Sequence, residues 1–171
     1  MENLLILINI ILAVVLIIVI LLQRSEGGAL GLGVSQDNFT SARSVGTFLT
    51  KFTSIIATLF IICSIAIVAI SGGYHRYYSH KTFECGKVHQ FLINFFGIFS
   101  GAGPALTWAA VHKQHHAYSD KEDDPHSYHR LGKWAVYVNT WGYESKIKRR
   151  FIKTLWRDPM LKWFHKNYFK L

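Results

Sequence analysis

Two long apolar runs constrain this chain more than any other feature of the sequence. Leu4–Leu22 contains only Asn9 as a clearly polar residue, and Phe52–Ile70 contains no charged residue. Each run has 19 residues, which in a helix span roughly 28 Å, close to the hydrocarbon thickness of a bilayer. Neither run shows the alternation of polar and apolar residues that is typical of a strand. The sequence therefore predicts an all-α integral membrane protein with two transmembrane helices.

The residues around the first run argue against a cleaved signal peptide. Such a peptide has an apolar region of only about 7–15 residues, with Lys or Arg before it and a small-residue cleavage site after it. Here Met1-Glu2-Asn3 precedes the longer run, and no Ala-x-Ala site follows. The segment from Gln23 to Gly33 is polar and rich in glycine, so we expect a loop that joins the two helices into a hairpin.

Positive charge is concentrated in the C-terminal part of the chain. The net charge is +9, and from His112 onward 13 Lys and Arg residues stand against 6 Asp and Glu residues. A basic region beside apolar helices predicts basic amphipathic helices on the lipid headgroups of the cytoplasmic side. Nucleic-acid binding is the alternative, but no recognition motif accompanies the charge, so we expect no nucleic-acid partner. Cys63 and Cys85 are expected at different depths, which argues against a disulfide.

Five histidines form two tight clusters, each just after an apolar stretch. His75 and His80 are five positions apart, which on a regular helix separates them by about 140°, so only an irregular helix end aims both at one centre. His112, His115 and His116 follow the i, i+3, i+4 spacing and share one helical face. Histidine is the commonest neutral metal ligand. The two clusters together therefore predict a metal site.

Zinc is the first alternative for the metal. Structural zinc sites usually include Cys and need only four ligands, whereas five histidines without cysteine pairs suit an iron centre better. Between the clusters, residues 90–111 carry no charge but contain glycines and a proline, which favours an interfacial or re-entrant segment over a third span. Four further histidines lack such spacing and are expected at the surface or the membrane interface: His89, His126, His129 and His165.

The N-terminal region resembles a known family in two motifs. Residues 21–31, Leu-Leu-Gln-Arg-Ser-Glu-Gly-Gly-Ala-Leu-Gly, and residues 48–60, which begin Phe-Leu-Thr-Lys-Phe-Thr-Ser, closely resemble the SecG subunit of the bacterial protein-export translocase. The resemblance covers residues 1–71, essentially the whole length of that two-helix family. It implies an accessory role beside the SecY channel in SecA-driven export, a place in the bacterial inner membrane, and no catalytic residue.

The remaining residues, 72–171, resemble membrane-bound acyl desaturases of the Δ9 type. Residues 73–83 and 112–127 carry the resemblance. It implies a non-haem di-iron site, molecular oxygen, an electron donor and a fatty acyl substrate. The family has a third histidine box after two further transmembrane helices, whereas this sequence has only His165 downstream of His129. We therefore expect an incomplete iron site and no activity from this chain alone. Five positions match the first two boxes of the family: His75 and His80, then His112, His115 and His116.

The completeness of the two regions decides the function that the sequence predicts. Residues 1–71 supply a whole SecG-like module, whereas residues 72–171 supply part of a desaturase. The main expectation is accessory support of protein export, and an oxygen-dependent di-iron acyl desaturase, or a fragment of one, is the alternative. The two resemblances imply conflicting topologies, because SecG ends lie outside the cytoplasm and histidine boxes lie inside. An inverted hairpin, a third span, a chance fusion, and an assembly error near residues 70–72 are the explanations left open.

Overall fold

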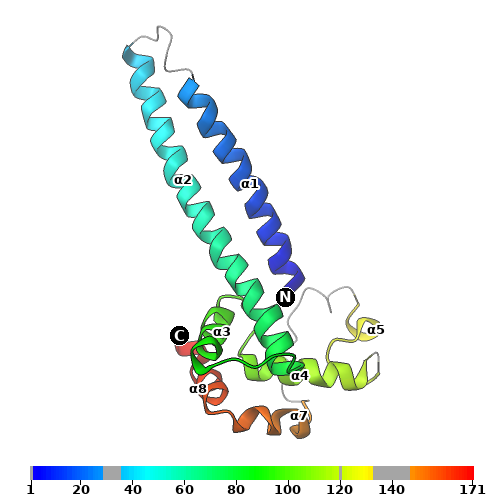
Figure 1. Ribbon diagram of the computed structural model, residues 1–171. Helices are drawn as coiled ribbons and strands as arrows, with labels where there is room; N and C mark the ends of the chain where they lie inside the picture. The colour runs from blue at the N-terminus through cyan, green and yellow to red at the C-terminus, as the bar shows by residue number, and fades with distance from the viewer. Residues whose placement is uncertain (1, 29–35, 120, 133–146) are drawn as a thin grey trace. The chain divides into compact units, whose positions relative to one another are not determined.

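The computed structural model describes residues 2–28, 36–119, 121–132 and 147–171, and every regular element within these ranges is helical (Figure 1). The predicted all-α class is confirmed. The contacts divide the chain into two compact units, Leu7–Cys63 and Met1–Ile6 with Ser64–Leu171. The elements follow one another in this order: α1 (Glu2–Gly28), α2 (Gln36–Val68), the π-helical segment η2 (Ala69–Ser79), α3 (Lys87–Ile98), α4 (Ala105–Tyr118), α5 (Tyr128–Leu131), α7 (Arg149–Lys153), the 3₁₀ turn η4 (Leu155–Arg157), α8 (Pro159–Asn167) and η5 (Tyr168–Lys170).

Two helical stretches of the described chain are long and apolar enough to cross a membrane. They are Asn3–Gln23, and Val45–Ser79 along α2 and η2, and they contain both of the predicted runs. Within the unit Leu7–Cys63, Gln23 Nε2 donates to Thr53 Oγ1 at 2.7 Å. Large apolar side chains are exposed along both helices, which is typical of helices that face lipid: Ile10, Ile17, Leu21, Ile55 and Ile61.

Helix α1 is longer than the sequence predicts. The segment from Gln23 to Gly33 was expected to be a loop, but α1 continues to Gly28, so that prediction is wrong for its first part. Gln, Arg and Glu are good helix formers and let the helix extend beyond the apolar run. Residues 29–35, the second part of that segment, lie outside the described residues.

The core of the second unit lies where η2 packs against α4. Ile70, Tyr74 and Tyr78 of η2 are buried there. Small side chains let the two helices approach closely, and the contacting face of α4 is rich in alanine: Ala105, Ala109 and Ala110.

Two glycines allow a similarly close approach between η2 and α3. A Cβ atom at Gly73 would collide with the side chain of Ile93, and one at Gly97 would collide with the ring of Tyr74. The atoms in the way include the Cβ of Ile93, which moves only with its backbone, and the ring of the buried Tyr74. Both positions therefore favour glycine, which has no side chain. The packing that carries His75 therefore depends on glycine at two points.

The charge-free stretch between the histidine clusters forms two helices with a break between them. Gly101 and Gly103 have φ values of 63° and 85°, which glycine adopts without strain, and Pro104 precedes the first turn of α4. The prediction that this stretch does not form one continuous helix is confirmed. Helices of 12 and 14 residues, α3 and α4, are also shorter than the roughly 20 residues that a span needs.

Asp158 fixes the C-terminal helices to the rest of the second unit. Its Oδ1 accepts hydrogen bonds from the backbone N–H groups of Met160 and Leu161 at 2.9 and 3.3 Å, which caps α8. Its Oδ2 accepts from the side-chain amide of Gln90 on α3. On α8, Leu161 is buried, whereas Trp163 is 50% exposed.

Candidate metal centre

A π-helical turn at the end of η2 brings His75 and His80 together. The backbone N–H of His80 donates to the carbonyl of His75 at 3.1 Å. This i→i+5 bond widens the turn, so residues five apart lie much closer to one side of the helix than the separation of about 140° on an α-helix. The two ring centroids lie 4.7 Å from each other. The irregular helix end that the sequence required is therefore a π-helix.

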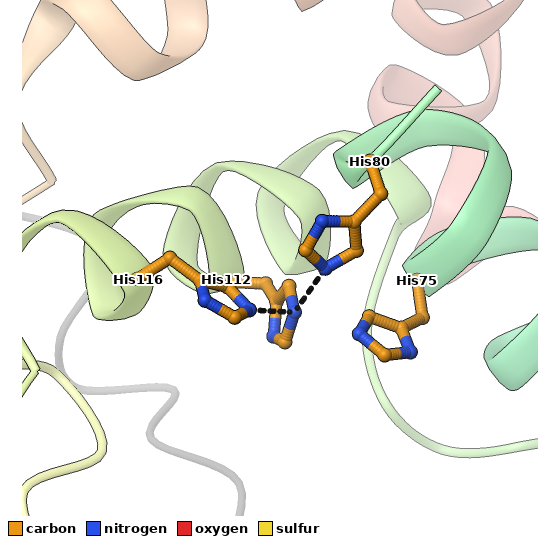
Figure 2. Close-up of side chains that lie close together, drawn as sticks. All are labelled: His75, His80, His112 and His116. Atoms are coloured by element: carbon orange, nitrogen blue, oxygen red, sulfur yellow. Dashed lines mark hydrogen bonds between the residues drawn. The ribbon is translucent and has the colours of Figure 1, made fainter. Parts of the chain in front are cut away.

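Helix α4 supplies His112 and His116 to the same place. The Nε2 atom of His112 lies 2.9 Å from that of His116 and 3.2 Å from that of His80, as the dashed lines in Figure 2 show. The ring of His75 lies 4.5 Å from that of His112. These four residues, here called the four-histidine group, offer ligand atoms that all lie within 4.8 Å of one another.

The spacing of these nitrogens fits a transition-metal ion. Bonds of about 2.1 Å from metal to imidazole nitrogen place neighbouring ligands ~3.0 Å apart and opposite ligands ~4.2 Å apart. The two Nε2 distances, 2.9 and 3.2 Å, agree with neighbouring ligands. The widest separation, at most 4.8 Å, exceeds the opposite-ligand value by ~0.6 Å, which small ring rotations can close. Imidazole nitrogen is a common ligand for iron, zinc, copper and nickel.

Burial and mutual repulsion favour the neutral form of two members of the group, His112 and His116. The pKa of His112 is lowered to about 3, first by burial and then by the neighbouring imidazoles, of which His75 is the first. The pKa of His116 is also lowered, again mainly by burial. A neutral imidazole has a lone pair for a cation, so these two side chains release no proton when a metal binds at neutral pH. Trp108 stacks on the ring of His112 with centroids 4.9 Å apart and holds it in place.

His115 is the predicted ligand that does not join the four-histidine group. Its Nδ1 lies 2.7 Å from Oδ1 of Asp124, a side chain with no exposed surface. Its ring centroid lies 5.7 Å from that of His116 and 6.2 Å from that of His112. Four of the five predicted ligands therefore converge, and the fifth lies beside them. Metal binding by all five stays a prediction.

The other histidines have separate surroundings. His89 and His129 are exposed, as expected. His126 is half-buried, with its ring 5.7 Å from that of His115. Burial is also the main cause that lowers the pKa of His126. His165, also half-buried, packs its ring 5.6 Å from that of Trp156.

Asp124 and Trp108 contact the site but were not predicted from the sequence. Asp124 belongs to a run of acidic residues after the second cluster, and no periodicity distinguishes it from its neighbours. The signal that could have found it is the following Pro125, because an Asp-Pro pair favours the start of a turn. Trp108 lies one helical turn before His112, a spacing that puts the two rings on one face.

Two family models match the chain. The fatty acid desaturase model matches residues 52–171, and the model of the preprotein translocase SecG subunit matches residues 2–84. The desaturase match covers well over half of the residues, and the chain belongs to the fatty acid desaturase family. Both models include residues 52–84, which hold most of the second candidate span and the first histidine cluster. The SecG and desaturase resemblances seen in the sequence are thus both confirmed.

Curated relatives are desaturases and a related acetylenase. The hex-5-enoyl-[acyl-carrier protein] acetylenase of Moorena producens (strain JHB) is 28% identical over 118 residues, which are 61% of this chain and 36% of that protein. The acyl-CoA Delta(11) desaturase of Trichoplusia ni is 34% identical over 115 residues, 64% and 32% of the two chains. The sn-1 stearoyl-lipid 9-desaturase of Anabaena variabilis is 29% identical over 104 residues, which are 59% of this chain and 38% of that protein. The chain thus spans about a third of the length of these relatives. No solved structure matches it.

Proposed function

We propose that this chain binds iron through the four-histidine group and forms part of the di-iron centre of a membrane fatty acyl desaturase. The convergence of two histidine clusters within the region matched by the desaturase family carries the proposal. His75 and His80 from η2, with His112 and His116 from α4, would hold the metal. When bound, iron would supply the activation of molecular oxygen that removal of hydrogen from an acyl chain requires.

The placement of the group supports a site at the membrane boundary. His75 and His80 stand at the end of the candidate span Val45–Ser79, where an acyl chain passes from headgroup to hydrocarbon. The Gln23–Thr53 hydrogen bond supports a hairpin of two spans. Exposed aromatic residues near basic ones on the C-terminal helices, such as Trp163 at 50%, support contact with lipid headgroups. We place the chain in the bacterial inner membrane as a multi-pass protein.

The substrate class follows from what the relatives share. Their names specify acyl chains carried by acyl-carrier protein, coenzyme A or lipid. The carriers differ, whereas the acyl chain is common to all three. We therefore propose a fatty acyl chain as the substrate, with a separate electron donor.

Metal analysis of the purified full chain tests this proposal. The protein would be loaded with Fe(II) without oxygen, desalted, and compared with a variant carrying both His112→Ala and His116→Ala. We expect the double variant to lose most of the bound iron, because two of the four donors are gone. His89→Ala, an exposed histidine outside the group, is the matched control and should keep the iron. Equal iron in wild type and double variant would contradict the proposal.

An accessory role in protein export is the second candidate, supported by the SecG match over residues 2–84. The partner would be a SecY-type channel. Expression of the full chain in a SecG-deficient bacterium should then restore export, and site-specific crosslinks from α1 or α2 should reach SecY. The histidine double variant should rescue equally well, because an accessory role needs no metal. Failure of both rescue and crosslinking would remove this candidate.

A further inference from the structure

A buried carboxylate outside the four-histidine group organises the loop after α4. Asp124 has no exposed surface. Its Oδ1 accepts a hydrogen bond from the backbone N–H of His126 at 2.8 Å and lies 2.7 Å from Nδ1 of His115. The bond to the residue two positions ahead is an Asx-turn, which fixes the direction of the carboxylate. Pro125, between the two residues, restricts the backbone further.

A second contact holds this loop against α4 independently of His115. Gln114 is buried, and its Nε2 donates to the backbone carbonyl of Asp123 at 3.0 Å. Its Oε1 accepts from the backbone N–H of Lys148 at 2.9 Å. The loop is thus fixed to the helical turn that bears His115, so the carboxylate of Asp124 meets the imidazole at a set position.

The chemistry of this contact determines which nitrogen of His115 carries a proton. An ionised carboxylate only accepts hydrogen bonds, so Nδ1 must be the donor. In a neutral imidazole the other nitrogen, Nε2, then holds the lone pair. A carboxylate that accepts from the distal nitrogen of a metal-binding histidine fixes its tautomer and raises its basicity.

We infer that Asp124 is a positioning residue of the metal centre, which holds His115 as the Nδ1–H tautomer so that Nε2 is a further ligand beside the four-histidine group. This inference rests on the proposed metal-binding function of the group. It accounts for a histidine that has the spacing of a ligand yet lies outside the cluster. It also explains why a carboxylate is buried in this loop, where an unpaired charge would be costly.

Asp123 provides a matched control next to Asp124 in the chain. Its side chain is 54% exposed and pairs with Lys148 at 2.7 Å. An Asp→Asn change at either position removes the same charge from the same loop. Only the change at Asp124 replaces the carboxylate that faces His115 with an amide, whose NH2 group can donate to Nδ1 where the carboxylate can only accept.

The tautomer of His115 can be measured without any metal. Two-bond ¹H–¹⁵N correlation spectra of the full chain in detergent, labelled on histidine and assigned with His115→Gln, report which ring nitrogen carries the proton. We expect Nδ1 in the wild type and in Asp123→Asn, and a shift toward Nε2 protonation in Asp124→Asn. A wild-type His115 protonated on Nε2 would overturn the inference whether or not the variants fold.

Co(II) titration then tests the consequence for the metal. Relative to Asp123→Asn, Asp124→Asn should bind Co(II) about tenfold more weakly or worse, the usual cost of removing such a partner, with an altered visible spectrum. Identical affinity and spectrum in the two variants would overturn the inference and leave the proposed function intact. A wild type that binds no Co(II) would instead remove the proposed function, and the inference with it.

Discussion

His112 and His115 share one face of α4 yet have opposite electrostatic surroundings. Other imidazoles and burial surround His112, which lowers its pKa to about 3. His115 faces the buried carboxylate of Asp124. In the first setting burial and like imidazoles favour the neutral form of the histidine, whereas in the second a carboxylate acceptor selects its tautomer. Two predicted ligands only three positions apart are thus kept ready for a metal in different ways, His112 by burial among imidazoles and His115 by a carboxylate.

The lowered pKa of His112 predicts an acid sensitivity of the metal-free protein. In the unfolded chain this side chain titrates near pH 6.5, and in the folded chain near pH 3. Between these values the unfolded state binds more protons, so stability falls as the pH is lowered through this window. His112→Gln, which cannot be protonated, should lose less stability between pH 7 and pH 4. Thermal unfolding in detergent, followed by circular dichroism at each pH, measures the stability of both proteins. An equal loss of stability in the wild type and in His112→Gln would contradict the lowered pKa of His112.

A second prediction at this scale concerns the contribution of His115 to metal content. If its Nε2 is a ligand beside the group, His115→Ala should lower the iron content of the purified chain. The loss should be smaller than that caused by His112→Ala. The Nε2 atom of His112 lies within 3.2 Å of the Nε2 atoms of two other predicted ligands, His80 and His116. Iron analysis of both variants measures the difference. An iron content for His115→Ala equal to that of His89→Ala would show that His115 is not a ligand.

At the scale of the element, the sequence predicts what depends on composition and misses what depends on packing. The spans and the break near Gly101 follow from charge-free length and from glycine, which act locally. The spacing of His75 and His80 required an irregular helix end, but its π-helical form depends on contacts with α3 and α4 that local sequence does not reveal. The Asp124–His115 contact was missed for the same reason, since a loop must fold back onto α4 to make it.

The close approach of η2 and α3 predicts different outcomes for two neighbouring glycines. Gly73→Ala places a Cβ against the side chain of Ile93, whereas a Cβ at Gly72 meets no atom within 4 Å. Overpacking of this kind costs about 1–3 kcal/mol. Gly73→Ala should therefore lower the melting temperature and the metal affinity, because η2 carries His75 and His80. Gly72→Ala should leave both close to the wild-type values, and similar losses in the two variants would contradict the packing argument.

At the scale of the whole molecule, the two family matches meet within one helical stretch. Both include residues 52–84. Helix α2 continues into η2 at Val68 and Ala69, and residues 70–72, where the sequence predicts the boundary between the regions 1–71 and 72–171, lie within η2. The two compact units divide at Cys63 and Ser64. The first histidine cluster thus lies at the end of the helical stretch that forms the second candidate span. The SecG match and the desaturase match therefore share this stretch.

Whole-chain chemistry gives a further prediction. The four-histidine group and His115 provide five imidazoles, fewer than a pair of fully coordinated irons requires. Membranes containing the 171-residue chain, supplied with oxygen, reductant and acyl substrate, should form no oxygen-dependent double bond. Gas chromatography of the acyl chains measures this. Two tightly bound irons per chain together with double-bond formation would contradict it and show that the chain is active by itself.

The central claim is that the four-histidine group holds iron, and X-ray absorption at the iron edge of the Fe(II)-loaded full chain tests it most directly. Imidazole rings bound to iron give a characteristic outer-shell scattering from their distant ring atoms. We predict this signature in the wild type and in His89→Ala, and its loss with most of the iron in the variant carrying His112→Ala and His116→Ala. Bound iron without imidazole scattering in the wild type, or an unchanged spectrum in the double variant, would contradict the account.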